Sequence, residues 1–170
     1  KDPPTVLGLN PLQLRLLKRT LKSREKGDCV VFTHAPPIYS LDKIPKIKLS
    51  WQTYSALKFK HKMNTGTFLF NNWNFVSILM KSKRNVTVVS SHIHFPKNYI
   101  LDKKTKNFWE ATTKELSKYA KDKRYIKFVV TMALGGIMEY SRKIGYTKIS
   151  SKGYENKVIG NYHKKYLVPL

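Results

Sequence analysis

Two short apolar runs rich in valine are prominent along the chain, and each ends at a histidine. Residues 29–33 lead into His34, and residues 86–91 lead into His92-Ile93-His94. Runs of this length, bounded by proline or polar residues, are typical of strands buried on both faces. Because ligands of open α/β sheets bind beyond the carboxyl ends of the strands, both junctions predict a site there.

An amphipathic helix is predicted before each of these strands. The first begins with Asn10 as its N-cap, Pro11 at its first position and Gln13 at capping-box distance, and Gly27 is expected to stop it. Its inward stripe is formed by Leu14, Leu17 and Leu21. The second is expected over residues 72–82, with one face carrying Trp73, Val76 and Met80. The order helix, strand, histidine therefore occurs twice.

The rest of the chain extends this α/β pattern without a linker or an internal repeat, so residues 1–170 are predicted to form one domain. The further elements expected are strands at 99–101 and 125–131, a helix at 109–121, a hairpin of 145–149 with 154–159, and an irregular basic stretch over 35–70 with one short helix near 51–60.

The charge balance is strongly basic, with 33 Lys and Arg against 10 Asp and Glu and a formal net charge of +23. Such a field attracts polyanions: nucleic acid, acidic lipid surfaces or phosphorylated substrates. Most of the cations are lysines spread through every segment, and lysine lacks the guanidinium fork that binds phosphate or guanine bidentately. The charge favours an anionic partner without identifying one. A lysine-biased composition, or an acidic region missing from this chain, is the alternative.

Composition also bounds the class of protein. With 41% hydrophobic and 12% aromatic residues, a globular domain is expected. No apolar stretch approaches the roughly 20 residues that cross a bilayer, and residues 1–4 do not resemble the start of a signal peptide. The single Cys29 cannot form an internal disulfide and is predicted to be a small core residue. No compartment follows from these features.

The spacing of His92 and His94 has a chemical consequence. In extended backbone, side chains two residues apart leave the same face roughly 6.5–7 Å apart. That spacing suits two imidazoles that address two metal ions about 3.5–4 Å apart, and His34 adds a third nitrogen. A structural or surface role is the alternative, since His-x-His alone is a weak motif. His61 and His163 lie among basic residues and are predicted to be solvent-exposed.

Anionic ligands are harder to find. Asp28 opens its strand and is expected about 20 Å from His34. Asp42 and Asp102 lie in predicted loops and stay candidates, whereas the carboxylates predicted to be helix-surface charges are Glu25, Glu110, Glu115 and Asp122. The sequence therefore offers nitrogen ligands but no obvious bridging carboxylate.

The two histidine segments resemble the C-terminal half of the calcineurin-like metallophosphoesterases, which include the purple acid phosphatases. Residues 13–22 and Cys29-Val-Val-Phe-Thr-His34-Ala-Pro-Pro37 resemble the helix, strand and His-x-Pro-Pro segment of that family. Ser91-His92-Ile93-His94 resembles its Gly-His-x-His motif, and residues 131–136 and 145–149 are similar to the strands beyond it. The resemblance covers roughly residues 9–160.

The resemblance implies a mixed-sheet αββα sandwich with helices outside, of which this chain forms the C-terminal half. It implies a hydrolase: a phosphatase with a dinuclear metal centre of two divalent or trivalent ions, drawn from Fe, Mn and Zn. The residues matching His34 and His92 bind one ion, the one matching His94 binds the other, and a metal-bound hydroxide hydrolyses a phosphate ester.

Two departures from the family shape this prediction. Ser91 replaces the usual glycine, and the N-terminal motifs Asp-x-His, Gly-Asp-x-x-Asp and Gly-Asn-His-Asp/Glu are absent. An N-terminal half, in the same precursor or in a separate chain, is therefore expected to complete the site, with a phosphorylated molecule as substrate. The chain alone is expected to be inactive, and a half-sheet predicts an open strand edge and an uncovered apolar face.

Two other functions compete with this one. A mononuclear zinc hydrolase would need only the three histidines and an open water position, and it would bind one metal per chain. A degenerate non-catalytic domain would bind nucleic acid through its charge, with an affinity that falls steeply with salt and ignores chelators.

Overall fold

The computed structural model describes residues 8–23, 27–38, 49–50, 69, 71–91, 96–131, 143–150 and 153–161, and it describes residues 49–50, 143–150 and 153–161 by their backbone only. Its helices are α1 (Pro11–Lys22), α3 (Asn72–Met80) and α4 (Thr113–Lys118). Its strands are β1 (Asp28–Thr33), β2 (Leu49–Ser50), β3 (Asn85–Ser90), β4 (Lys97–Asp102), β5 (Asn107–Glu110), β6 (Tyr125–Val130), β7 (Lys143–Ser150) and β8 (Gly153–Asn161).

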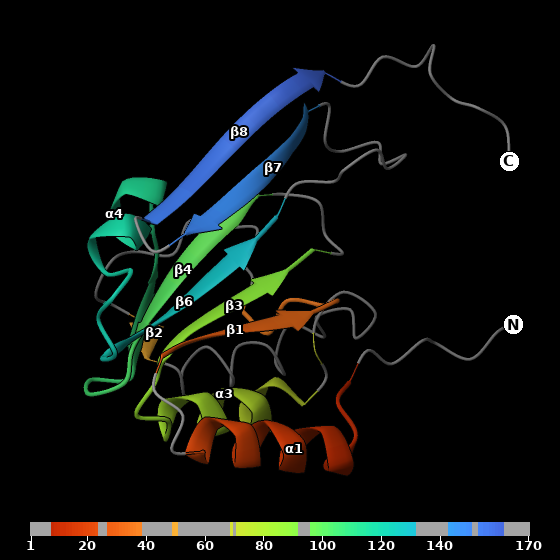
Figure 1. Cartoon of the computed structure of the whole chain (residues 1–170), viewed down its shortest axis with the longest axis vertical. Helices are drawn as coiled ribbons and strands as arrows, with labels where there is room; N and C mark the ends of the chain where they lie inside the picture. The colour runs from red at the N-terminus through yellow and green to blue at the C-terminus, as the bar shows by residue number, and fades with distance from the viewer. Residues whose placement is uncertain are drawn as a thin grey trace, which may run out of the picture.

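The described strands form one mixed six-stranded sheet in the order β1-β3-β6-β4-β5-β2, together with the hairpin β7–β8 (Figure 1). Strands β1, β3 and β6 are parallel, and β4, β5 and β2 each run antiparallel to the preceding neighbour in that order. Helices α1 and α3 cover one face, α4 packs on the other, and β8 lies against α4. The α/β class, the mixed sheet and the flanking helices are thus confirmed.

Side-chain alternation along the central strands builds a core on each face of the sheet. Tyr99 and Leu101 of β4 join the cluster under α1 and α3, whereas Ile100 joins Trp109 and Leu116 under α4. Strand β3 is buried almost throughout, as its valine run predicts. Both faces of the sheet are therefore buried at its centre.

Helix α1 begins where its capping signals predict. The backbone N–H of Gln13 donates to Asn10 Oδ1 and the N–H of Asn10 donates to Gln13 Oε1, both at 2.8 Å. The helix ends at Lys22, because the hydroxyl and the backbone N–H of Ser23 both donate to the Thr20 carbonyl. The predicted stop at Gly27 is therefore wrong: that residue, with a φ of 133°, instead precedes β1.

The prediction that β1 is buried on both faces is wrong. This strand is at the edge of the sheet, where Cys29 and Val31 are half-buried against the α1–α3 core. Val30 and Phe32 point to the other face and are 43% and 76% exposed. Among the described residues β1 pairs on one side only, so the open edge and the uncovered apolar face are both present.

The predicted positions of two aromatic residues are wrong. Trp73 is 44% exposed, because α3 buries the i, i+3, i+4, i+7 stripe of Asn72, Phe75, Val76 and Leu79. Trp109 lies in β5 and does not start a helix, since the capping box of Thr112 and Glu115 starts α4 at Thr113.

Some predicted elements lie outside the described residues. They are the short helix near 51–60, most of the irregular stretch 35–70, and residues 132–136 of the glycine-rich segment. The hairpin is confirmed as β7–β8, and the strand at 125–131 is confirmed as β6.

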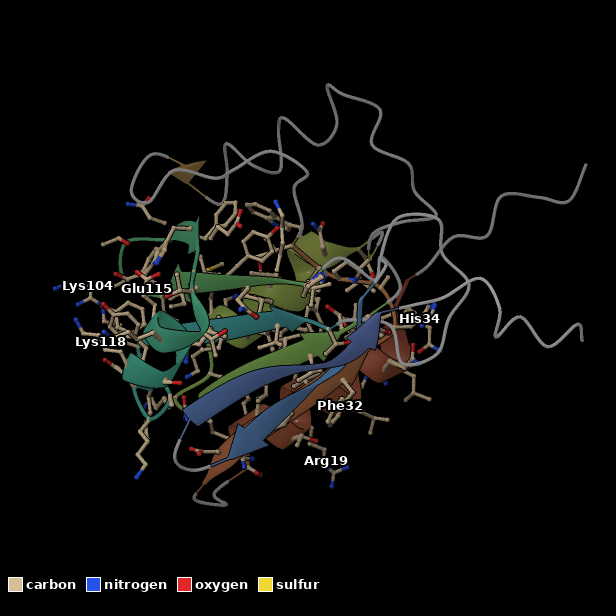
Figure 2. The ribbon with its side chains drawn as sticks, turned by 90° about the horizontal axis from the view of Figure 1, so that it is seen from above. Arg19, Phe32, His34, Lys104, Glu115 and Lys118 are labelled. Carbon is tan, nitrogen blue, oxygen red and sulfur yellow. The ribbon has the colours of Figure 1, made fainter. Side chains whose placement is uncertain are left out.

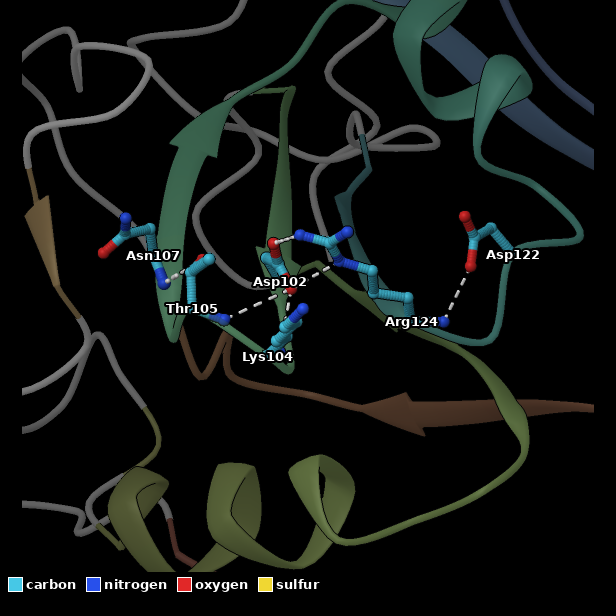
Figure 3. A network of polar contacts seen from close by, with 6 residues as sticks. All are labelled: Asp102, Lys104, Thr105, Asn107, Asp122 and Arg124. Atoms are coloured by element: carbon cyan, nitrogen blue, oxygen red, sulfur yellow. Dashed lines mark hydrogen bonds and ion pairs between the residues drawn. The ribbon is translucent and has the colours of Figure 1, made fainter.

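A polar network closes the β4–β5 turn and ties it to the start of β6 (Figure 3). The buried Asp102 carboxylate accepts hydrogen bonds from the Arg124 guanidinium and from the backbone N–H groups of Lys104, at 2.8 Å, and Thr105, at 3.4 Å. Burial alone raises the pKa of Asp102, but these donors outweigh it and hold the pKa at about 2. The ionised carboxylate therefore stabilises the fold.

This network predicts a contribution to acid stability. The pKa of Asp102 is lowered from 3.8 to about 2, so its stabilisation is complete above about pH 4 and is lost as the pH falls towards 2. Asp102→Asn is expected to cost about 1–2 kcal/mol at pH 7, a figure reduced because the Arg124 side chain is 45% exposed. Urea unfolding from pH 2 to 7 measures this. Asp102→Asn and Arg124→Gln should both reduce the fall of the unfolding free energy between about pH 4 and pH 2. A fall as steep as that of the wild type contradicts the assignment.

Candidate functional site

The three parallel strands end together. Thr33 of β1, Ser90 of β3 and Val130 of β6 are in register across the sheet. The ladder continues past the strand ends, since the N–H of Ser91 donates to the His34 carbonyl at 3.2 Å and the N–H of Thr131 donates to the Ser90 carbonyl at 2.8 Å. The structure thus joins the two strand-to-histidine junctions by a backbone hydrogen bond.

Of the candidate histidines, His34 lies in the described part of the chain. His34 lies at the carboxyl end of β1, exposed on the molecular surface (Figure 2), which confirms its predicted position. His92 and His94 fall within residues 92–95, outside the described residues, as do His61 and His163. Their roles therefore stay predictions.

The loop after His34 is held in place by its carbonyl groups. Residues 35–38 are buried, and prolines 36 and 37 have no N–H to donate. The Leu69 N–H donates to the Pro36 carbonyl at 3.1 Å, and Asn72 Nδ2 donates to the Pro37 carbonyl at 3.0 Å. A loop anchored in this way presents His34 from a fixed backbone.

Asn72 is a positioning residue that the sequence analysis did not identify. It begins α3 and is 5% exposed, on the apolar face of the helix. A buried amide needs hydrogen-bond partners, so a polar residue in that stripe was the available signal.

The described carboxylates lie away from His34. Asp28 opens β1 at the opposite end of the strand, as predicted. Asp102 ends the antiparallel β4, next to the start of β6, and is bound by Arg124, so its candidacy as a ligand is wrong. Glu110 is not on a helix: it ends β5, paired with Lys97 at 3.4 Å, roughly 19 Å from β1 at the usual strand spacing.

No metal centre is complete within the described part of the chain. No group of three or more His, Cys, Asp or Glu side chains there is placed to hold a metal ion. Asp42 and Glu25 lie outside that part. The arrangement therefore offers one imidazole on a fixed strand end, beside the chain segment that leads to two more.

A second polar cluster lies at the opposite, amino end of the parallel strands. The buried Lys127 ammonium donates to Asn85 Oδ1 and, at 3.1 Å, to the Tyr125 carbonyl. Lys103 Nζ donates to the carbonyls of Ser82 and Arg84, both at 2.9 Å. Burial lowers the pKa of both lysines to about 8. Because their acceptors are carbonyl and amide oxygens of neighbouring elements, we assign these lysines a structural role.

Comparisons with known proteins add no relative to this description. No protein-family model, no curated protein and no solved structure matches the chain. In the described part of the chain, no helix combines the length and apolar character that crossing a membrane requires.

Proposed function

We propose that this chain is the C-terminal half of a metal-dependent phosphoesterase, with His34 and His92 as ligands of one metal ion and His94 as a ligand of a second. The observation that supports the proposal best is the hydrogen bond from the Ser91 N–H to the His34 carbonyl, 3.2 Å long. His92 is bonded to Ser91, so covalent geometry keeps its Cα about 3.8 Å from that of Ser91. The proposal therefore places both metal ligands at the carboxyl ends of the neighbouring strands β1 and β3.

The donor set fits such metals in part. Neutral imidazoles suit Zn, Fe and Mn, whereas a bridging position calls for a carboxylate. Among the described residues no group of three or more His, Cys, Asp or Glu side chains is placed to hold a metal ion, which favours a site completed by another segment. When bound, two ions lower the pKa of a water molecule and offset charge on phosphate oxygens. This chain's part is to orient imidazoles, with Asn72 and Leu69 fixing the loop behind His34.

The position of β1 as the edge strand of the sheet supports the same proposal. Strand β1 is at the end of the strand order, and Phe32, just before the His34 junction, is 76% exposed. An open edge beside an exposed aromatic side chain is what a further strand or sheet would cover. A completing half docked there would lie next to His34.

Native mass spectrometry of the protein isolated from its natural source tests the proposal. A second chain, or a heavier precursor, with two bound metal ions is the expected result. A lone chain with one tightly bound metal would favour the mononuclear zinc hydrolase, and a lone metal-free chain would overturn both. Purified residues 1–170 are expected to show no phosphatase activity on an aryl phosphate, so robust activity would contradict the split site.

A further inference from the structure

A group of basic hollows lies around α1 and the amino ends of the parallel strands, away from His34 at their carboxyl ends. A hollow of about 510 Å³ at the ends of α1 and α3 is lined by five cations: Lys22, Lys81, Lys83, Arg84 and Lys123. A shallower one, also of about 510 Å³, follows α1 and is lined by Arg15, Lys18, Arg19 and Lys22. A third, of about 330 Å³, separates α1 from α3.

These hollows form one continuous surface, because they share lysines. Lys22 lines all three, Lys18 lines two, and Lys81 lines two. All three lysines are exposed, so their ammonium groups are available to a ligand. Among the described residues, no aspartate or glutamate lines any of the hollows. We call this set of hollows the basic surface.

The backbone beneath the basic surface is fixed. The Arg84 guanidinium donates to the carbonyls of Thr20, at 3.3 Å, and Gly27, at 3.4 Å, which joins the end of α1 to the approach to β1. Lys103 Nζ donates to the Ser82 and Arg84 carbonyls just after α3. The lysines of the surface therefore extend from a preset scaffold, which reduces the ordering cost of binding.

We propose that the basic surface binds the phosphate backbone of a nucleic acid without reading its sequence. The charges line concave hollows that follow one another, which suits a strand with regularly spaced phosphates. Most of the cations are lysines, which neutralise phosphates as point charges and do not specify bases. The described residues that line the hollows include no aromatic side chain, so the proposal assigns the binding to charge and not to base stacking.

An anionic membrane is the competing ligand. Leu12 and Leu16 on the outer side of α1 are 60% and 52% exposed, and basic helices with exposed leucines can lie on lipid. A bilayer is flat and meets protruding side chains first, whereas Lys22 and Lys81 line hollows. The concave shape therefore favours nucleic acid, and vesicles become one arm of the test.

The test compares two variants of the full chain with the same change in charge. Lys18, Lys22 and Lys81 are replaced by glutamine in one. Lys104, Lys114 and Lys118, which are also exposed, are replaced by glutamine in the other. Figure 2 shows Lys104 and Lys118 well apart from Arg19 of the basic surface. Binding to a fluorescent single strand and a duplex of roughly 20 nucleotides is measured by anisotropy across a salt series.

The first variant is expected to bind two to three orders of magnitude more weakly at about 0.1 M salt, because each of the three lost contacts contributes nearly tenfold there. The slope of log K against log salt should become shallower by about three. The second variant should change affinity by less than about threefold, and Lys→Arg at the first three positions should keep binding. Circular dichroism establishes that both variants are folded.

Equal losses in the two variants would overturn the proposal, since net charge alone would then explain the binding. Unchanged nucleic-acid binding in the first variant would overturn it as well. If that variant loses binding to phosphatidylserine vesicles but not to nucleic acid, the surface is a membrane contact. No histidine is among the described residues that line the basic surface, so each proposal can fail without the other.

Discussion

Replacing His92 by alanine is expected to weaken the binding of Zn²⁺ or Mn²⁺ by at least about 100-fold. Loss of a ligand removes a metal bond outright, and even the loss of an outer hydrogen-bond partner of a ligand weakens affinity 10- to 100-fold. His34→Ala should have a comparable effect, because both imidazoles are assigned to the same ion. The measurement is calorimetric titration of the full chain, with its completing segment if one is found, followed by native mass spectrometry.

Matched histidine variants make this result specific. His61→Ala and His163→Ala remove an imidazole from basic, predicted solvent-exposed segments and should leave metal binding unchanged. His34→Ala should leave nucleic-acid affinity unchanged, because His34 is not among the residues that line the basic surface. The proposed metal ligand His92 is expected to behave in the same way. Metal affinity equal in all four variants would remove the basis for the proposed function.

Truncating Phe128 to alanine is expected to destabilise the chain by about 3–5 kcal/mol, whereas Phe32→Ala should cost less than about 0.5 kcal/mol. The two residues share a chemistry and differ in burial. Phe128 in β6 is 1% exposed within the α1–α3 core, and Phe32 in the edge strand β1 is 76% exposed. Urea unfolding followed by circular dichroism measures both changes.

The same pair tests whether the apolar face is free in the isolated chain. A large cost for Phe32→Ala would mean that something already covers this face, through self-association or another segment. With a completing half present, Phe32→Asp should instead weaken the complex while leaving the isolated chain as stable as before. If Phe32→Asp leaves the affinity of the complex unchanged, this face is not the docking surface.

The elements that depend on neighbouring residues along the chain were predicted correctly. The capping box of Asn10 and Gln13 begins α1, the valine run at 86–91 forms β3, and the predicted hairpin of 145–149 with 154–159 pairs as β7 with β8. Each depends on a few neighbouring residues, through a cap, a period or a turn. The strand-to-histidine junction at His34 belongs to the same class, because it needs only the end of one strand.

Errors arose where a partner far along the chain decides the outcome. Trp109 resembles the start of a helix, but pairing of β5 with β4 places it in the sheet. Asp102 resembles a free loop carboxylate until Arg124, 22 residues later, binds it. Such contacts depend on strand order, which a period of hydrophobic residues does not encode.

The α/β class, the positions of most elements and the residues that end the two valine runs can be predicted from the sequence, because caps and periods act over a single turn or strand. Three features depend on long-range packing: β1 is an edge strand with Phe32 exposed, the Ser91 N–H bonds to the His34 carbonyl, and lysines of α1 and the lysine directly after α3 line shared hollows. These features follow from which elements become neighbours, and that choice is made by packing of the whole sheet against its helices.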